Sequence, residues 1–313
     1  MRRRQPRKHR QSLVSWSKRF LSCLGNIRTT WRPPPTVNAS GIRRSGRVRW
    51  GCSIRRPEPL GEGSSPHGVV VGQDGAAWVT DTGLNAIVRV DAEARELAVW
   101  PLSGPNANLN TAAVDEEGVV WFTGQNGIVG RLDSVTQLPG TPLEPLAAPR
   151  GQGPYGIDVT SDGDVYYASL AGSYLGRVVQ GPDGSFTLEV IEPPTPNQGT
   201  RRVWSDSTGV LWTSQWNAGQ VARYDPEMGE WTEWRLPGDA PQAYSVYVDE
   251  RDDVWLSDFG ANALVRFDPD TETFATVRLP HADARVRQML GRPGEVWGAE
   301  SGADALVVVR TEC

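Results

Sequence analysis

The chain has 313 residues and a formal net charge of −5, with 13 Trp, 34 Gly and 24 Pro. This composition favours many short strands joined by tight turns over a helical fold. The three cysteines are too few for a disulfide framework and lack the spacing of a zinc or redox motif. No apolar run approaches the roughly 18 residues needed to cross a bilayer, so we expect no membrane span.

The first 56 residues and the rest of the chain differ sharply in net charge. Residues 1–56 contain sixteen Lys and Arg and no acid, whereas the rest of the chain has sixteen Arg against 37 acids, a net charge of −21. An acidic body argues against nucleic acid as a partner of the folded part. We therefore expect the basic character to be confined to an N-terminal tail.

The tail, residues 1–53, combines low hydrophobicity with high net charge, which predicts disorder. Its Arg-rich composition fits either an organelle transit peptide or translated sequence upstream of the natural start. It has no apolar segment followed by a small-residue cleavage site. The cytoplasm is then the default location, with export as the alternative if the true start and signal are missing.

Residues 66–91 show the pattern that the following sequence repeats. An apolar run at 68–71 is followed by a turn at Asp74-Gly75, a second run around Trp78 and a third that alternates up to Asp91. Asp-Gly between two strand-like runs is a strong hairpin signal, because both residues tolerate the turn conformation. The segment is therefore predicted to be a β-meander.

An aromatic residue marks the second strand of each repeat, at intervals of 42 to 46 residues: Trp78, Trp121, Tyr166, Trp212, Trp255 and Trp297. A third strand follows every marker, and a fourth follows in five of the six copies. Four strands in a repeat of this length predict an all-β fold, a β-propeller with six visible four-stranded blades, over residues 54–313. Because the last repeat lacks its fourth strand, we expect residues 54–60 to close the ring or to stand in for the end of a lost blade.

Two columns of polar residues recur in these repeats. Antiparallel pairing predicts that the residue eleven positions before each marker lies beside the residue three positions after it. The first column is His67, Asn110, Tyr155, Arg201, Tyr244 and, after a one-residue deletion, Arg287. The second is Asp81, Gly124, Ser169, Gln215, Asp258 and Glu300. We expect both to ring the mouth of the central channel and to bind a small molecule there, although such residues also make hydrogen bonds between blades.

The columns contain candidates for proton transfer and metal binding. His67 is the one histidine among them and suits a general base, a metal ligand or a structural hydrogen bond. Asp81, Asp258 and Glu300 offer the oxygen ligands that Mg²⁺ or Ca²⁺ requires, or are solvated turn carboxylates.

Other members of the columns suit binding rather than proton transfer. Arg201, Arg202, Arg285 and Arg287 form a cationic rim suited to a carboxylate or phosphate, unless they pair with the acids of the second column. Asn110, Tyr155 and Gln215 complete the predicted contacts to a substrate. We expect the propeller to act as a monomer.

Several segments carry a resemblance to a known family: PHGV at 66–69, PYGI at 154–157, WFTGQNGIVGRLD at 121–133 and the strands NAIVRVD and NALVRFDP. Together they resemble the virginiamycin B lyase family. The resemblance implies a seven-bladed propeller whose lyase members open streptogramin B antibiotics by elimination across an ester linkage. It also implies a histidine base, a second histidine at a strand start, and glutamates that hold Mg²⁺ in the last blades.

This sequence departs from that pattern at the positions that carry the chemistry. Tyr244 occupies the strand start where one histidine is expected, Arg287 replaces the base histidine and so joins His67 and Tyr244 as a candidate catalytic residue, and Arg285 replaces a glutamate. Glu300 keeps an acid near the expected metal-ligand position. An arginine cannot act as a base near neutral pH.

Three functions follow from the residues and the resemblance. The first is a carbon–oxygen lyase acting on a cyclic ester, with Glu300 and Asp258 holding Mg²⁺ and with His67 or Tyr244 transferring protons. The second is a non-catalytic propeller that binds a small ligand or a protein through its arginine rim. The third is a lactonase-type hydrolase, which needs a metal-bound water.

Overall fold

The computed structural model describes residues 60, 62–91, 94 and 96–311. All regular elements of these residues are strands, which confirms the predicted all-β class. None of the described residues forms a helix long and apolar enough to span a membrane. The predicted tail, 1–53, and most of the predicted closing segment, 54–60, lie outside the described residues.

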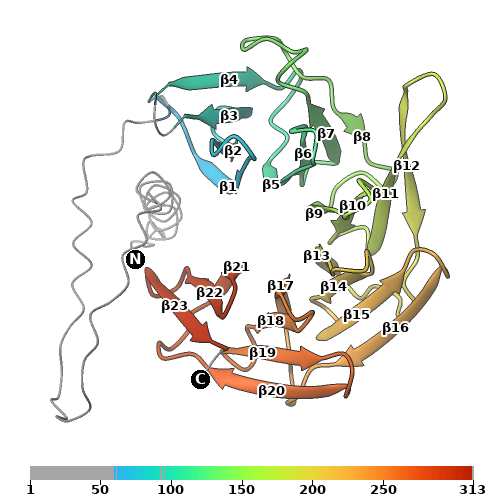
Figure 1. Cartoon of the computed structure of the whole chain (residues 1–313), viewed down its shortest axis with the longest axis vertical. Helices are drawn as coiled ribbons and strands as arrows, with labels where there is room; N and C mark the ends of the chain where they lie inside the picture. Colours follow the sequence, from blue (N-terminus) through green and yellow to red (C-terminus); the bar gives the residue numbers. More distant parts are fainter. Residues whose placement is uncertain (1–59, 61, 92–93, 95, 312–313) are drawn as a thin grey trace, which may run out of the picture.

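The strands form six antiparallel sheets arranged around a common axis (Figure 1). The first sheet contains β1 (Pro66–Val71), β2 (Ala77–Asp81), β3 (Ala86–Val90) and β4 (Leu97–Pro101). The second contains β5 (Leu109–Val114), β6 (Val120–Gly124), β7 (Ile128–Leu132) and β8 (Leu146–Ala147). The third contains β9 (Pro154–Val159), β10 (Val165–Ser169), β11 (Tyr174–Gln180) and β12 (Phe186–Ile191).

The remaining three sheets continue in chain order. The fourth contains β13 (Thr200–Ser205), β14 (Leu211–Gln215), β15 (Gln220–Asp225) and β16 (Glu230–Arg235). The fifth contains β17 (Ala243–Val248), β18 (Val254–Asp258), β19 (Ala263–Asp268) and β20 (Thr273–Arg278). The sixth contains β21 (Val286–Arg292), β22 (Glu295–Glu300) and β23 (Ala305–Arg310), so it lacks a fourth strand among the described residues, as the sequence predicts.

The first strand of every sheet is its innermost one. Each inner strand packs against the next, in the order β1, β5, β9, β13, β17 and β21, while β21 and β1 have no contact of comparable extent. Figure 1 accordingly shows the first and last sheets on either side of the one interruption in the ring of described strands. The six sheets thus surround a channel lined by their inner strands.

A glycine in the inner strand permits this close approach. A Cβ atom on Gly68 would lie 2.5 Å from the carbonyl oxygen of Asn110, on the neighbouring sheet. A Cβ on Gly156 would lie 2.7 Å from the Cα of Arg202. The glycines of the segments PHGV and PYGI are therefore required by the packing of one inner strand on the next.

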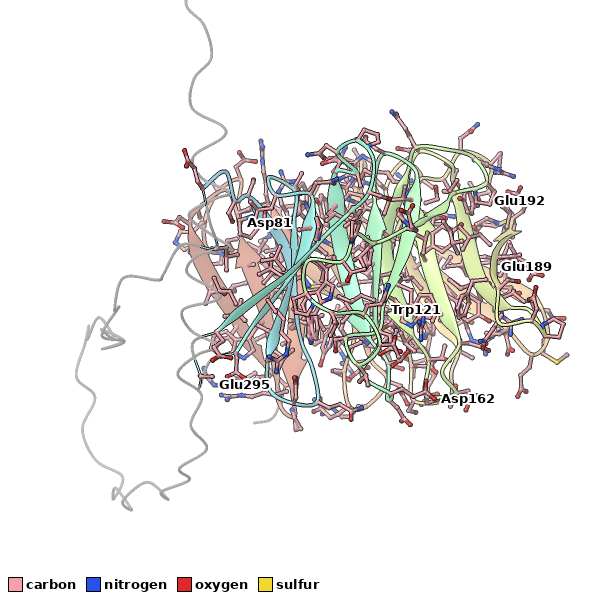
Figure 2. The ribbon with its side chains drawn as sticks, turned by 90° about the horizontal axis from the view of Figure 1, so that it is seen from above. Asp81, Trp121, Asp162, Glu189, Glu192 and Glu295 are labelled. Carbon is pink, nitrogen blue, oxygen red and sulfur yellow. The ribbon has the colours of Figure 1, made fainter. Side chains whose placement is uncertain are left out.

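Apolar clusters between neighbouring sheets form the core. One contains Trp78 and Trp100 from the first sheet with Phe122 and Leu132 from the second. The side view in Figure 2 places Trp121 in the body of the ring, between a face that carries Asp81 and an opposite face that carries Asp162 and Glu295. Five of the six marker aromatic residues are buried core residues, whereas Trp297, in the sixth sheet, is half-buried.

An aspartate at the start of the hairpin turn fixes the marker tryptophan in three of the sheets. In the fifth sheet, Asp249 Oδ1 accepts hydrogen bonds from the backbone N–H of Arg251 (2.9 Å) and of Asp253 (3.1 Å). Its Oδ2 accepts the indole N–H of Trp255 at 2.8 Å. Asp115 and Asp206 bind Trp121 and Trp212 in the same way. One carboxylate thus closes the turn and satisfies a buried indole.

Replacing Asp249 with alanine is expected to lower the free energy of unfolding by about 2 to 3 kcal/mol, because three hydrogen bonds are lost and a buried donor is left unpaired. Chemical denaturation measures this change. Asp268 is a matched control, since it also accepts two backbone N–H groups of a turn but binds no indole. The Asp268→Ala variant should lose less than about 1 kcal/mol, and equal losses in the two variants would contradict the assigned role of the indole bond.

Candidate functional site

An irregularity in the pairing of each inner strand decides where the polar columns lie. In the first sheet Pro66 pairs with Asp81 and Gly68 pairs with Thr80, so His67 is an extra residue in its strand. The residue opposite Asp81 is therefore Pro66, and the prediction that His67 lies beside Asp81 is wrong by one residue. The reason is a β-bulge, which inserts one residue into one strand of the pair.

The same bulge occurs at the start of the inner strand in all six sheets. It separates the two predicted columns, since a bulge turns the side chain of the inserted residue away from the regular alternation. The first column lies along the channel, whereas the second is buried between the strands and the loops that precede them. Of the two columns that the sequence placed at one mouth, the second is therefore buried, and three residues of the first, Arg201, Tyr244 and Arg287, line a cavity.

The acids of the second column hold loops in place. Asp81 accepts hydrogen bonds from the hydroxyl of Ser64 and from the backbone N–H groups of Ser65 (2.8 Å) and Leu84 (3.0 Å). Asp258 Oδ1 accepts the backbone N–H groups of Gln242 and Gly260, both at 2.8 Å. At 0% and 1% exposed, these two carboxylates have no access to a ligand in the channel.

Glu300 and Gln215 are also engaged away from the channel. Glu300 is 0% exposed and its Oε2 lies 2.5 Å from the Nδ1 of His281. Gln215 donates to Glu233 and accepts from Gln220, within its own sheet. Neither side chain lines the two cavities of the channel described below.

The described residues contain no cluster of three or more His, Cys, Asp or Glu that could hold a metal ion. Ca²⁺ takes six to eight oxygen ligands, largely from carboxylates and carbonyls, whereas Mg²⁺ keeps several waters and is held by one or two carboxylates. Asp81, Asp258 and Glu300 lie in three different sheets, and only Asp258 Oδ2 and Glu300 Oε1 among their oxygens are buried without a hydrogen-bond partner. The three carboxylates therefore do not form the joint Mg²⁺ or Ca²⁺ site that the sequence predicts.

A cavity of about 410 Å³ opens at the mouth of the channel instead. It is lined by two column residues that the sequence assigned to catalysis, Tyr244 and Arg287, together with Arg201 and Arg285. Trp216, Gln242, Phe259 and Asp283 complete the lining and were not predicted. Trp216 and Phe259 directly follow the second column in the sequence, and this repeated aromatic position is the signal that could have found them.

The hydroxyl of Tyr244 is the centre of this cavity's polar network. It lies 2.6 Å from the hydroxyl of Tyr155 and accepts a hydrogen bond from Arg287 Nη1 at 3.1 Å. The ring of Tyr244 stacks on Phe259, with 4.6 Å between ring centroids, and the guanidinium carbon of Arg201 lies 3.6 Å from its centroid. Four different sheets or loops thus converge on one phenol.

This environment changes the acidity of Tyr244. Burial opposes its ionisation, but the charges of Arg201, Arg202 and Arg287 and the hydrogen bond from Tyr155 outweigh burial and lower the pKa of Tyr244 to about 8. Tyr155 behaves in the opposite way, since burial and the neighbouring phenol raise its pKa. Tyr244 is therefore the member of the pair that ionises, with Tyr155 as its hydrogen-bond donor.

The three cations around Tyr244 have no carboxylate partner among the described residues. Arg201 Nη2 donates to the hydroxyl of Tyr155 at 3.0 Å, Arg202 Nη1 donates to Thr111 Oγ1 at 2.7 Å, and Arg287 Nε donates to Ser301 Oγ at 3.0 Å. The Nε atoms of Arg201 and Arg202 are buried without a hydrogen bond.

The remaining predicted rim arginine behaves differently. Arg285 pairs with Asp283 at 2.7 Å, not with an acid of the second column. Arg201, Arg202 and Arg287, in contrast, have no carboxylate partner among the described residues. They are therefore suited to bind an anion or to stabilise developing negative charge.

His67 lies on the channel side of β1. His67 is exposed to the channel, and desolvation by the surrounding protein, followed by the charge of Arg202, lowers its pKa to about 4, so the ring is neutral at neutral pH. Its Nδ1 lies 3.2 Å from the carbonyl oxygen of Asn110. Asn110 is buried, and its side-chain oxygen accepts the hydroxyl of Thr111. His67 and Asn110 thus contact each other and are not among the residues that line the cavity with Tyr244.

Known proteins show the same sequence pattern and fold. A curated virginiamycin B lyase from Nocardia farcinica is 29% identical over 164 residues, which cover 52% of each chain, so this chain matches about half the length of that relative. A catalytically inactive virginiamycin B lyase from Staphylococcus aureus, solved with Quinupristin, has a TM-score of 0.71 at 20% identity, over 80% of this chain and 82% of that one.

Other solved propellers extend the similarity in fold. A streptogramin B lyase structure has a TM-score of 0.51 at 22% identity, over 75% of this chain and 90% of that one. These likenesses to solved structures show the fold alone. The model of the virginiamycin B lyase family matches residues 53–305. The chain therefore belongs to the virginiamycin B lyase family.

Proposed function

We propose that the mouth cavity is the site of a carbon–oxygen lyase in which Tyr244 is the base. The observation that carries the proposal is the hydroxyl of Tyr244, held between Tyr155 and Arg287, with a pKa of about 8. A catalytic base is most effective when its pKa lies near the working pH. Membership in the virginiamycin B lyase family supports elimination as the class of reaction.

The reaction would be an elimination across an ester. The phenolate of Tyr244 takes the proton from the carbon next to a carbonyl group, and the electrons of that C–H bond form a carbon–carbon double bond. The bond between the neighbouring carbon and the ester oxygen breaks, and the ester leaves as a carboxylate. No water is consumed, and negative charge moves from the phenolate through the carbonyl oxygen to the leaving carboxylate.

The arginines would stabilise that charge. Arg201 and Arg287 line the cavity and both contact the pair of tyrosines. Because neither has a carboxylate partner among the described residues, their charge is available to the enolate oxygen and to the leaving carboxylate. Fixed cations in a site that excludes water can lower a barrier by several kcal/mol. In this proposal Arg201 and Arg287 take the place of Mg²⁺, for which the described carboxylates form no common site.

His67 is a weaker candidate for the base than Tyr244. With a pKa of about 4, its neutral ring holds a proton poorly at neutral pH. It is also bonded to the neighbouring strand through Asn110. Of the two residues that the sequence suggested for proton transfer, Tyr244 has the geometry and the acidity that the reaction needs.

Mass spectrometry after incubation with a streptogramin B and with simple O-acyl-threonine peptides tests the proposal. Elimination gives ring opening without a change in mass for the cyclic ester, and loss of the acyl group as a carboxylate for the peptides. The Tyr244→Phe variant should lose at least about a hundredfold in rate, as removal of a general base typically does. Tyr224→Phe, a buried tyrosine outside the channel, is the matched control and should retain full activity.

Other outcomes of the same incubation identify the alternatives. A gain of one water would favour lactonase-type hydrolysis and contradict the elimination. Binding without any change in the ligands would favour a non-catalytic binding propeller, the function to which the unpaired arginines are also suited. Equal activity of the Tyr244→Phe variant and the unmodified protein would contradict the role of Tyr244.

The pH dependence provides an independent prediction. Since the active form of Tyr244 is the phenolate, the rate should rise with pH and level off above an inflection near pH 8. The Arg287→Met substitution removes a cation and a hydrogen bond that favour the phenolate, so the pKa rises and the inflection should move to higher pH. Arg287→Lys retains the charge and should give a smaller shift. An inflection that does not move in Arg287→Met would contradict the assignment.

The arrangement of the carboxylates also predicts that divalent metal ions neither bind to the propeller nor affect its activity. Calorimetric titration with Mg²⁺ or Ca²⁺ should show no specific binding to the propeller, because the described residues lack a cluster of three ligands. Activity on the ester substrates should be unchanged by a chelator. Stoichiometric Mg²⁺ binding that is lost in Glu300→Gln would restore the metal-assisted mechanism and exclude the arginine mechanism.

A further inference from the structure

A second cavity lies deeper in the channel, away from the mouth. It has a volume of about 300 Å³, and its lining comes from the later residues of all six inner strands. Most of these residues are apolar, among them Val71, Val114, Val159, Val203 and Leu290. The mouth cavity, in contrast, is lined by the starts of the inner strands and by loops.

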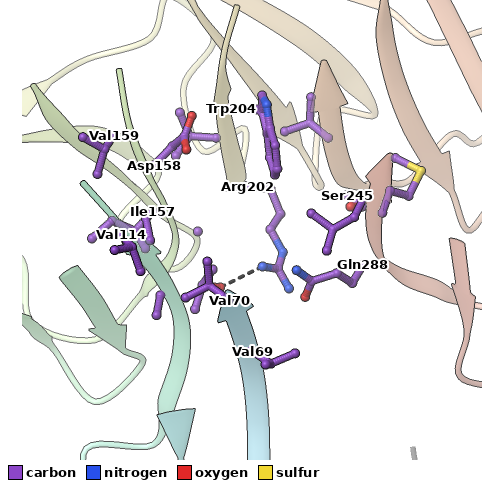
Figure 3. A pocket seen from close by; sticks show the side chains of 18 of the residues that line it. Val69, Val70, Val114, Ile157, Asp158, Val159, Arg202, Trp204, Ser245 and Gln288 are labelled. Atoms are coloured by element: carbon purple, nitrogen blue, oxygen red, sulfur yellow. Dashed lines mark hydrogen bonds between the residues drawn. The ribbon is translucent and has the colours of Figure 1, made fainter. Parts of the chain in front are cut away.

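Arg202 projects into this apolar cavity. Figure 3 shows its side chain extending from β13 toward Gln288, with a hydrogen bond drawn from its guanidinium group. That bond is the one from Nη1 to Thr111 Oγ1, at 2.7 Å. The residue is 8% exposed, and its Nε has no hydrogen-bond partner. A buried guanidinium with one neutral acceptor is incompletely satisfied, since it has five N–H donors.

No carboxylate of the cavity neutralises Arg202. The acid in the lining is Asp158, whose Oδ2 accepts the backbone N–H of Ser205 at 2.6 Å and its hydroxyl at 2.8 Å. Burial raises the pKa of Asp158 to about 6, and no ion pair joins it to Arg202 among the described residues. Burial of a charge without a partner costs several kcal/mol, and a bound anion offsets that cost.

We propose that this cavity binds an amphipathic carboxylate, with its carboxylate group on Arg202 and its apolar chain against the valine-rich walls. The volume of about 300 Å³ corresponds to roughly ten water-sized units of ~30 Å³, so the ligand has about ten non-hydrogen atoms. Octanoate matches that size. The inference does not depend on elimination at the mouth, because it concerns a different cavity and a different arginine.

Calorimetric titration of the full chain with octanoate, octanol and acetate tests the proposal. Octanoate should bind, and octanol and acetate should each bind at least about tenfold more weakly, because one lacks the charge and the other lacks the chain. Arg202→Met should weaken octanoate binding by about tenfold or more and leave octanol binding unchanged. Arg278→Met, on the outermost strand β20, is the matched control and should bind octanoate as the unmodified protein does.

Two results would overturn the proposal: equal affinities for octanoate and octanol in the unmodified protein, or unchanged octanoate affinity in Arg202→Met. The first comparison needs no variant, so it remains decisive if Arg202→Met does not fold. Tyr244→Phe should keep its octanoate affinity whether or not it retains lyase activity, which separates this inference from the proposed function. Loss of octanoate binding in Tyr244→Phe would assign the ligand to the mouth cavity and overturn the deeper site.

Discussion

The bulge at the start of each inner strand determines the functional architecture of this propeller. It places two residues opposite one, so the polar residue that begins the strand faces the channel, while the residue that ends the neighbouring strand stays buried. The buried residues then act as supports. Asp81 and Asp258 accept backbone N–H groups of the loops next to the mouth, and the channel residues are held by loops fixed in this way.

The distribution of charge in the propeller is unusual. The chain beyond its basic tail has far more acids than arginines, yet Arg201, Arg202 and Arg287 at its centre form no ion pair with a carboxylate among the described residues. On the outer strands arginines do pair with acids, as Arg266 does with Asp253 at 2.7 Å. Since charges interact more strongly where water is excluded, the three central cations dominate the potential at Tyr244. The acidic net charge of the chain therefore does not predict the positive charge of its central cavities.

Neighbouring arginines on β13 serve two different cavities. Arg201 lines the aromatic cavity at the mouth, together with Tyr244 and Trp216, and Arg202 lines the apolar cavity deeper in the channel. Both guanidinium groups contact the ring of Tyr155, with 4.4 and 5.2 Å between the guanidinium carbon and the ring centroid. Tyr155 is thus shared between the two sites.

The sequence by itself determined the repeated architecture. The strands, the hairpin turns and the three described strands of the sixth sheet follow from short-range patterns, because alternation and turn residues act within a few positions of one another. The family could also be predicted, since its motifs lie within single repeats. Only the tertiary structure decided which polar residues reach the channel. A bulge shifts the pairing by one residue without a change in the repeat, and the acidity of Tyr244 depends on arginines from two other sheets, which no local pattern in the sequence brings together.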